Sequence, residues 1–438
     1  MKELYHTEDA PKRAFLIGIR DRERSPGEEE SLAGEFAALA ESLGVEIAAQ
    51  ERVIPREDRS KFGVGSGKAR ELTEQAASLG ADCLIFDWEP SPSQQRNWEA
   101  LGGIPVIDRT ELIIRIFASR ARTREAELQV ELAELSYALP RLSHKYIDLS
   151  RQRGGSYGTR GAGETRFETD RRAIRERIRR VRGEIERVRK NREIQRKKRE
   201  KTVTSCALVG YTNSGKSSLL NALTGAGVPT EDKLFATLDP VARLVPEQKK
   251  DPSGEKKAPP GPLVLIDTVG FIRRLPHNLV DAFRSTLEEA VLADLLIHVL
   301  DASDPGAEGF FTTTMGVLRD LGADKKPMIL ALNKADRGIP PEFSGAFLRH
   351  YPDAIPVSAK TGQGLPELLR RMEEFAAGEL SQGTRFRFPP DRHDLAALLH
   401  RRGTVLSEKY EDDYIEIEAR ISPSLEETLR DYAVPGGC

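Results

Sequence analysis

The chain has 438 residues, 39% of them apolar and 31% charged, which is typical of a globular protein with about three domains. No apolar run approaches the roughly 18 residues of a membrane span, and the N-terminal residues lack the apolar stretch of a signal peptide. The three cysteines, Cys83, Cys206 and Cys438, have neither paired nor zinc-ligand spacing, so we expect no disulfide, no zinc site and a cytoplasmic protein.

The formal net charge of −2 hides a strongly basic block. Residues 151–201 contain 20 Lys and Arg against 8 Asp and Glu, so this block carries +12 and the rest of the chain carries −14. A basic block in an otherwise acidic protein indicates a polyanionic partner, most simply nucleic acid. The alternative is a charged helix face that only contacts solvent.

Residues 1–108 alternate short apolar runs with helical stretches, which predicts a small α/β domain with a parallel sheet. The runs are AFLIGI, VEIAAQ, DCLIFD and IPVID, and the helical stretches are EFAALAESLG and ARELTEQAASLG. The stretch KFGVGSGKAREL (61–72) is similar to a phosphate-binding loop, but Phe62 stands where the first glycine belongs and Ala69 where a Mg²⁺-binding hydroxyl belongs. We therefore interpret Gly67 as a structural glycine.

Two apolar stripes at helical spacing predict a coiled-coil helical hairpin over residues 109–201. The stripes comprise Leu128, Leu132, Leu135 and Leu139, and then Ile174, Ile178, Val181, Ile185 and Val188. The tip loop between them (141–167) is rich in glycine, which lets a backbone approach a partner closely, and in arginine, which binds phosphate. Candidate RNA contacts, including a tyrosine that can stack on a base, are Arg151, Arg153, Tyr157, Arg160 and Arg166. A flexible turn without a partner is the alternative.

Residues 202–378 repeat the βα alternation and carry a phosphate-binding loop. The segment CALVGYTNSGKSSLLNAL (206–223) places the pattern GxxxxGKS between an apolar strand and a helix, which is the context that this motif requires. Its amide groups and the helix N-terminus bind phosphates, Lys216 reaches the β- and γ-phosphates, and Ser217 ligates Mg²⁺. The predicted phosphate-binding residues are Gly210, Tyr211, Thr212, Asn213, Ser214, Gly215, Lys216 and Ser217.

Two later motifs predict that the base is guanine. The carboxylate of Asp336 can accept hydrogen bonds from N1–H and the exocyclic amine of guanine, whereas adenine would leave it unpaired. Lys334 can lie along the base plane, and the second motif supplies backbone contacts to the base O6. The predicted guanine-binding residues are Asn333, Lys334, Ala335, Asp336, Ser358, Ala359 and Lys360.

The γ-phosphate is expected to be sensed by two switch segments. Switch I comprises Phe235, Ala236, Thr237, Leu238 and Asp239, and switch II comprises Asp267, Thr268, Val269 and Gly270. We expect Thr237, or alternatively Thr230, to ligate Mg²⁺, Asp267 to hold it through a water, and the Gly270 amide to meet the phosphate. The Pro/Lys-rich stretch 246–262 between two apolar runs predicts a long hairpin turn.

Phe271 occupies the position at which Ras-type GTPases carry the glutamine that orients the attacking water. An apolar side chain cannot do this, and no glutamine occurs from Thr268 to Ala290. We therefore expect slow intrinsic turnover, with catalytic help from elsewhere.

Residues 379–438 contain a helix-strand-strand pattern, LAALLHRRG, TVLSEKY and YIEIEARI, which predicts a small α+β domain. The expected fold class is α/β: a P-loop GTPase domain (202–378) with a mostly parallel sheet, preceded by the small α/β domain and its hairpin, and followed by the α+β domain.

Taken together, the chain resembles the HflX family of translational GTPases, within the Obg–HflX group, over essentially its whole length. The resemblance rests on GYTNSGKSSLLNAL, FATLDP, DTVGFIRRLPHNLVDAFRSTLEE, NKAD and SAK, and on GTRGAGETRFETDRR upstream. The last stretch departs from the usual family form at Ala162, where proline is common, and at Arg166-Phe167, where Gln-Leu is usual.

The resemblance implies a cytoplasmic GTPase that binds the large (50S) ribosomal subunit in the GTP form, splits stalled 70S ribosomes under stress, and hydrolyses GTP to GDP. The basic hairpin would contact ribosomal RNA. We expect the protein to be a monomer and to associate with ribosomes or peripherally with a membrane. Mg²⁺ is the implied cofactor, and Asn213 matches the asparagine with which related GTPases coordinate K⁺; capping of the loop is its alternative role. ATP binding by the N-terminal domain is a further alternative in this family.

Two other functions stay open from sequence. One is a GTPase in large-subunit assembly or RNA modification without splitting activity. The other is a structural RNA-binding protein that its nucleotide merely stabilises, against which the complete set of Lys216, Ser217, Thr237 and Asp267 argues.

Overall fold

The computed structural model describes residues 11–55, 60–145, 162–199, 203–228, 234–235, 238–246, 262–274, 276, 279, 284–376, 384–402, 404–411, 413–421 and 423–434. The chain divides into two compact units. The first comprises Met1–Val188, Asp232–Leu238 and Arg274–Arg284, and the second comprises Arg189–Glu231, Asp239–Arg273 and Ser285–Cys438.

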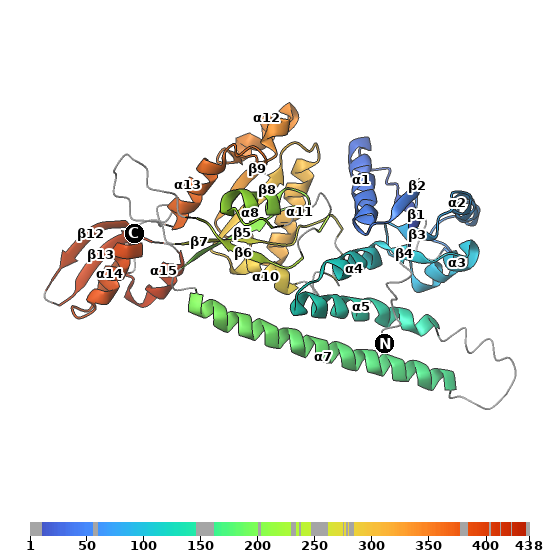
Figure 1. Ribbon diagram of the computed structural model, residues 1–438, viewed down its shortest axis with the longest axis horizontal. Helices are drawn as coiled ribbons and strands as arrows, with labels where there is room; N and C mark the ends of the chain where they lie inside the picture. The colour runs from blue at the N-terminus through green and yellow to red at the C-terminus, as the bar shows by residue number, and fades with distance from the viewer. Residues whose placement is uncertain are drawn as a thin grey trace. The chain divides into compact units, whose positions relative to one another are not determined.

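The first unit begins with a four-stranded parallel sheet in the order β2-β1-β3-β4, as the βα alternation predicts (Figure 1). Its strands are β1 Arg13–Ile19, β2 Glu46–Val53, β3 Cys83–Phe86 and β4 Val106–Asp108. Its helices are α1 Pro26–Ser42, α2 Ser66–Ser78, α3 Pro92–Gly102 and α4 Arg109–Arg120. Helices α2 and α3 cover one face of the sheet, and α1 and α4 cover the other (Figure 1).

Helix starts in this unit follow from local capping chemistry. Ser25 begins α1 with a reciprocal capping box to Glu28, and Ser91 does the same for α3 with Gln94. The Asp108 carboxylate, at the end of β4, accepts a hydrogen bond from the Glu111 amide at 2.8 Å and so caps α4.

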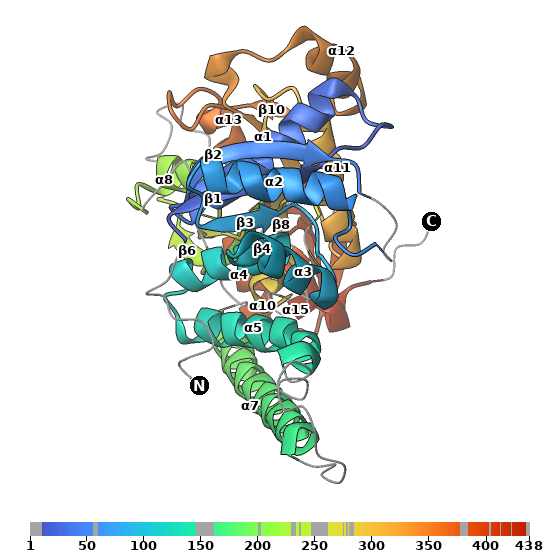
Figure 2. The same ribbon diagram turned by 90° about the vertical axis from the view of Figure 1, so that its right-hand side faces the viewer.

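The predicted hairpin is formed by α5, Arg124–Lys145, and α7, Ala162–Arg199, which lie side by side (Figures 1 and 2). The two apolar stripes pack together as expected, because neither helix can bury its stripe alone. Their shared core contains Leu128, Leu132, Leu142, Ile174, Ile178 and Val181, with Leu135, Leu139 and Ile185 packed against it.

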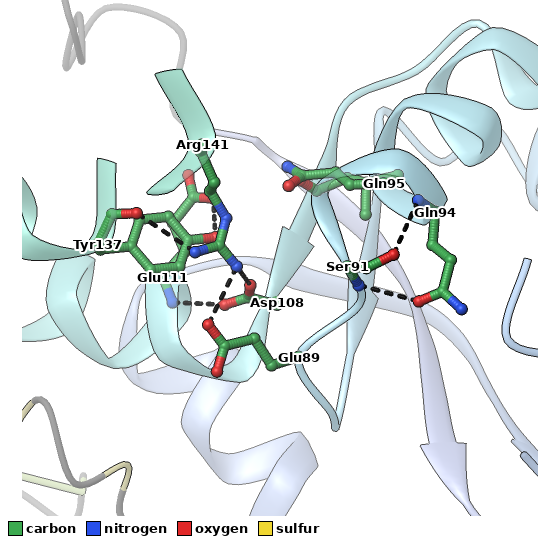
Figure 3. Close-up of polar contacts among 9 residues, drawn as sticks. Glu89, Ser91, Gln94, Gln95, Asp108, Glu111, Tyr137 and Arg141 are labelled. Carbon is green, nitrogen blue, oxygen red and sulfur yellow. Dashed lines mark hydrogen bonds and ion pairs between the residues drawn. The ribbon is translucent and has the colours of Figure 1, made fainter. Parts of the chain in front are cut away.

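A buried polar cluster joins α5 to the carboxyl end of β4 (Figure 3). The Arg141 guanidinium donates to Asp108 at 2.7 Å and to Glu89 at 3.1 Å. The Tyr137 hydroxyl donates its one hydrogen to Asp108 at 2.8 Å, and its oxygen also lies 3.2 Å from the Glu111 carboxylate. Burial raises the pKa of Asp108 to about 6, although Arg141 opposes the shift. The base of the hairpin is therefore tied to the sheet by hydrogen bonds as well as by apolar contact.

The second unit contains a six-stranded sheet in the order β10-β9-β8-β5-β7-β6. It is parallel except for β6, which pairs antiparallel with β7 on either side of the predicted turn; residues 247–261 of that turn lie outside the described residues. The strands are β5 Thr204–Val209, β6 Val241–Leu244, β7 Leu263–Asp267, β8 Leu295–Asp301, β9 Met328–Asn333 and β10 Ile355–Pro356. The helical elements are α8 Lys216–Thr224, α10 Arg284–Leu292, α11 Ala307–Asp320, η2 Ala335–Arg337, α12 Pro341–His350 and α13 Leu365–Ala376.

The end of the chain forms an antiparallel sheet in the order β11-β13-β12. The predicted helix and two strands are present as α14 His393–Arg402, β12 Thr404–Tyr410 and β13 Ile415–Arg420. Three further elements were not predicted: β11 Thr384–Phe388, α15 Pro423–Thr428 and η3 Arg430–Tyr432. In the described part of the chain, no helix is long and apolar enough to cross a membrane.

Candidate nucleotide-binding site

The predicted phosphate-binding loop joins β5 to α8, and its two motif glycines are sterically required. Gly210 and Gly215 have φ angles of 150° and 92°, a region that side chains disfavour. A Cβ at Gly210 would lie 2.2 Å from the Val299 carbonyl oxygen, and one at Gly215 would lie 2.2 Å from Nδ2 of Asn333. The loop can therefore approach both the neighbouring strand and the predicted guanine motif only without side chains at these positions.

Polar groups of this loop are buried in a way that suits a phosphate group. The Lys216 ammonium donates to the carbonyl oxygens of Gly210 at 3.2 Å and Tyr211 at 2.7 Å. Burial lowers the pKa of Lys216 to about 8, and the charge of Asp267 opposes this shift. The buried hydroxyls of Thr212 and Ser214 have no hydrogen-bond partner among the described residues. Because a buried polar group without a partner is costly, these groups fit a site completed by phosphate oxygens.

Oxygen atoms suited to Mg²⁺ meet beside the loop. The Ser217 hydroxyl, in the first turn of α8, donates to Oδ2 of Asp267 at 2.6 Å, and Asp267 ends the adjacent strand β7. A hydroxyl and a carboxylate are ligands that Mg²⁺ prefers. The two residues thus lie together as the sequence pattern predicts.

The residue that directly follows predicted switch II, Phe271, is bonded to the phosphate-binding loop through its backbone. The Phe271 amide donates to the Gly210 carbonyl at 3.1 Å, and the Thr212 amide donates to the Phe271 carbonyl at 2.7 Å. A Cβ at Gly270 would lie 2.8 Å from both Nζ of Lys216 and the Thr212 side chain. The Phe271 side chain is only 2% exposed. It is part of the core, where it cannot orient water.

The two predicted guanine motifs lie together at the ends of β9 and β10. The Ser358 hydroxyl donates to Asp336 at 2.6 Å, which lowers the pKa of that carboxyl group. Asn333 accepts from the Ala359 amide at 3.1 Å and donates to the Ser214 carbonyl at 2.8 Å. Asn333 therefore connects the guanine motifs directly to the phosphate-binding loop, as one site for a base and its phosphates requires.

Three family models match successive parts of the chain. They are described as GTP-binding GTPase N-terminal for residues 29–118, GTP-binding GTPase Middle Region for residues 120–199, and 50S ribosome-binding GTPase for residues 205–334. The protein named GTPase HflX of Akkermansia muciniphila is 43% identical over 432 residues, which cover 96% of each chain. The chain belongs to the HflX family of GTPases.

A second curated relative agrees with this family assignment, and one solved structure is also similar. GTPase HflX of Escherichia coli K12 is 40% identical over 409 residues and covers 92% of each chain. A solved GTP-binding protein of Sulfolobus solfataricus in complex with GDP is 26% identical, covers 84% of this chain and 100% of its own, and has a TM-score of 0.45. The family models and the two HflX relatives show that the chain is a GTPase.

Two features of this HflX-family site were missed from sequence. Asp301, at the end of β8, forms an ion pair of 2.7 Å with Lys334, whose φ of 61° is left-handed. Tyr211 stacks on Phe310, with ring centroids 4.2 Å apart, and its hydroxyl accepts a hydrogen bond from the Arg273 amide at 2.8 Å. The Tyr211 side chain thus contacts the segment after Phe271, in addition to the predicted role of its backbone at phosphate. For Asp301, the signal available in the sequence was an aspartate at the end of a buried apolar strand, a position at which polar side chains reach the site.

Several predicted site residues lie outside the described residues: Thr230, Ala236, Thr237, Arg151, Arg153, Tyr157 and Arg160. Arg166 lies in α7, but its side chain is outside the description. Among the described residues of switch II, the Thr268 hydroxyl donates to the Leu208 carbonyl at 2.6 Å. In the N-terminal glycine-rich stretch, Lys68 pairs with Glu71 of its own helix at 2.7 Å.

Proposed function

We propose that this GTPase binds the large ribosomal subunit in its GTP form through the basic hairpin, dissociates stalled 70S ribosomes, and leaves after hydrolysis. The observation that carries the proposal is the row of arginines along α7. The match of residues 205–334 to a model described as 50S ribosome-binding GTPase supports the same partner.

The described part of α7 presents much more positive charge than its hairpin needs. Arg177 pairs with Glu131 across the hairpin, and Arg179 pairs with Glu176 within the helix. Five further arginines are exposed and form no ion pair with described residues: Arg172, Arg175, Arg180, Arg182 and Arg187. Unpaired like charges along one helix repel each other, and a polyanion such as RNA would relieve this repulsion.

Sucrose-gradient sedimentation of 70S ribosomes with the protein and a non-hydrolysable GTP analogue tests the proposal. We expect the protein to co-migrate with 50S subunits while the 70S peak declines. Binding without loss of 70S would favour the assembly role, and no binding with any nucleotide would refute ribosome association.

Two variants make this experiment sharper. Replacing Arg172, Arg175 and Arg180 by glutamine should weaken binding and reduce its salt dependence, since each lost phosphate contact removes a released counterion. The matched control replaces Arg370, Arg387 and Arg392, three exposed arginines elsewhere in the chain, and should leave binding unchanged.

We propose Mg²⁺ as the cofactor of hydrolysis. Ser217 and Thr237 would hold it directly and Asp267 through a water, and the ion would neutralise charge on the phosphates. The chain's own part is to bind the triphosphate with the loop amides and Lys216, and to hold the Asp267 carboxyl group beside the Ser217 hydroxyl.

Asn213 is proposed to hold K⁺ and so to supply the electrostatic help that Phe271 cannot. Its φ of 58° is one that asparagine tolerates, so the residue could also be present only for the backbone. Asn213→Gly separates these roles because glycine keeps the conformation and removes the amide oxygen. We expect GTP turnover of the native protein to be faster in K⁺ than in Na⁺, and faster again with 50S subunits, and the K⁺ effect to vanish in Asn213→Gly. Persistence of the K⁺ effect in that variant would leave only the backbone role.

A further inference from the structure

Two short segments within the stretch matched by the GTPase model belong to the first compact unit. They are Asp232–Leu238, which contains most of predicted switch I, and Arg274–Arg284, which begins four residues after Gly270 of switch II. The structure describes residues 234, 235, 238, 274, 276, 279 and 284 of them. Part of predicted switch I and the segment just after predicted switch II therefore have described contacts inside the first unit.

The first contact involves Leu234 and Phe235. The Leu234 amide donates to the Ser42 hydroxyl, at the end of α1, at 3.1 Å. The Phe235 ring packs edge-on against Phe117 of α4, with centroids 4.6 Å apart and planes at 77°, and both rings are buried. An edge-to-face pair of buried aromatic rings contributes stabilisation beyond the burial of its surface, so it helps to hold Phe235 in place.

The second contact involves Arg274. Its guanidinium forms an ion pair of 3.2 Å with Asp87, which directly follows β3. Asp87 also pairs with the buried Arg109 at 2.6 Å, and Arg109 pairs with Glu35 of α1 at 2.6 Å. All four strands are parallel, and the order of addition changes side between β1 and β3, because β2 lies on one side of β1 and β3 on the other. The carboxyl end of the sheet at such a point is where open α/β folds bind ligands. Here an arginine of the chain itself reaches the aspartate at that position.

Backbone conformation singles out the same two residues. Among the described residues, four that are not glycine have positive φ: Asn213, Phe235, Arg274 and Lys334. Asn213 and Lys334 belong to the predicted phosphate and guanine motifs. Phe235, at 56°, and Arg274, at 53°, adopt a conformation that bulky residues keep only where surrounding contacts impose it.

We propose that Phe117 and Asp87 are positioning residues for GTP, because they hold Phe235 of predicted switch I and Arg274, four residues after Gly270 of predicted switch II, before the nucleotide binds. This rests on the proposed roles of Thr237 and Gly270 at the γ-phosphate. A triphosphate requires both segments to be ordered, whereas a diphosphate does not. Fixing part of each segment beforehand lowers the entropy that must be lost when GTP binds. The first unit thus favours the GTP form over the GDP form.

The test compares Kd values for a fluorescent non-hydrolysable GTP analogue and for fluorescent GDP, with the full chain and no ribosomes. Arg274→Ala and Phe117→Leu should each weaken triphosphate binding about five-fold or more and change GDP binding less than two-fold. Arg274→Lys, which keeps a cation near Asp87, should restore part of the loss.

Matched controls lose similar interactions without contacting either segment. Arg52→Ala removes an arginine that pairs with Glu29 and Glu30, and Phe62→Leu removes a buried ring that packs edge-on against Trp98. Both should leave the ratio of the two Kd values unchanged. In the Arg274→Ala background, Asp87→Asn should cause no further change in this ratio, because the pair is already broken.

An unchanged ratio in Arg274→Ala and Phe117→Leu, or equal weakening of both nucleotides, would overturn the proposal. So would a similar change of ratio in the two controls. Since no ribosome is present, failure here is separate from failure of ribosome binding, which sedimentation measures.

Discussion

His298 is a fully buried histidine in β8, and its replacement provides a quantitative test of the structure of the second unit. The residue pairs with Val209 and Leu330 in the sheet and stacks on Phe311 with ring centroids 4.9 Å apart. Neither ring nitrogen has a hydrogen-bond partner among the described residues. Burial, with a smaller contribution from the charge of Lys216, lowers the pKa of His298 to about 3.

The sign of the pH effect follows from this lowered pKa. In the unfolded chain the imidazole has its ordinary pKa of 6.5, so acid protonates the unfolded state first. The contribution of His298 to the free energy of unfolding is therefore fully present above pH 6.5 and is lost as the pH falls toward 3. At pH 5, about 1.5 pH units below the unfolded pKa, the loss is about 2 kcal/mol at roughly 1.4 kcal/mol per unit.

We expect His298→Phe, which keeps the stacked ring, to remove this contribution. Urea unfolding followed by far-UV circular dichroism at pH 7 and pH 5 would measure it: the free energy of unfolding of the variant should decline by about 2 kcal/mol less than that of the native protein. Replacement of the exposed His350 in the same unit is the control. Trp88 and Trp98, the two tryptophans of the chain, lie in the first unit, so their fluorescence should show no such difference.

An equal decline in the native protein and in His298→Phe would refute the reasoning. It would mean that the ring is hydrated or protonated in the folded state, and that the packing of β8 against α11 differs from the structure.

Three further predictions concern the nucleotide site and the hairpin. Because burial lowers the pKa of Lys216 to about 8 and bound phosphates favour its charged form, GDP affinity should fall by up to about ten-fold per pH unit above pH 8; a flat fluorescence titration up to pH 9.5 would contradict this. Asp336→Asn should weaken GDP binding about 100-fold or more, since guanine loses a charged acceptor; calorimetry showing native affinity would exclude the assigned base contact. Tyr137→Phe removes the hydroxyl that donates to Asp108 and should lower the free energy of unfolding of the first unit by about 1–3 kcal/mol, which tryptophan fluorescence would detect; an unchanged midpoint would show that the cluster is not stabilising.

Elements with a local cause could be predicted from sequence. Gly210 and Gly215 stand where the backbone needs positive φ, so the phosphate-binding loop is visible as a pattern of residues. The stripes from Leu128 and from Ile174 have helical spacing, and each needs the other for burial, so the hairpin follows from periodicity. In the same way, an apolar residue at Phe271 already implied that no side chain there orients water.

Tertiary structure alone decided which distant residues meet. The ion pair between Asp301 and Lys334 and the hydrogen bond between Tyr211 and the Arg273 amide join residues whose spacing carries no signal. Phe235 packs on Phe117 of α4, which lies more than a hundred residues earlier in the sequence. Both residues belong to the first compact unit, whereas the phosphate-binding loop belongs to the second. This contact depends on where the chain comes back to α4, which no local pattern indicates. Local sterics and periodicity act over one or two turns of chain, whereas these contacts depend on the packing of whole elements, which no short stretch specifies.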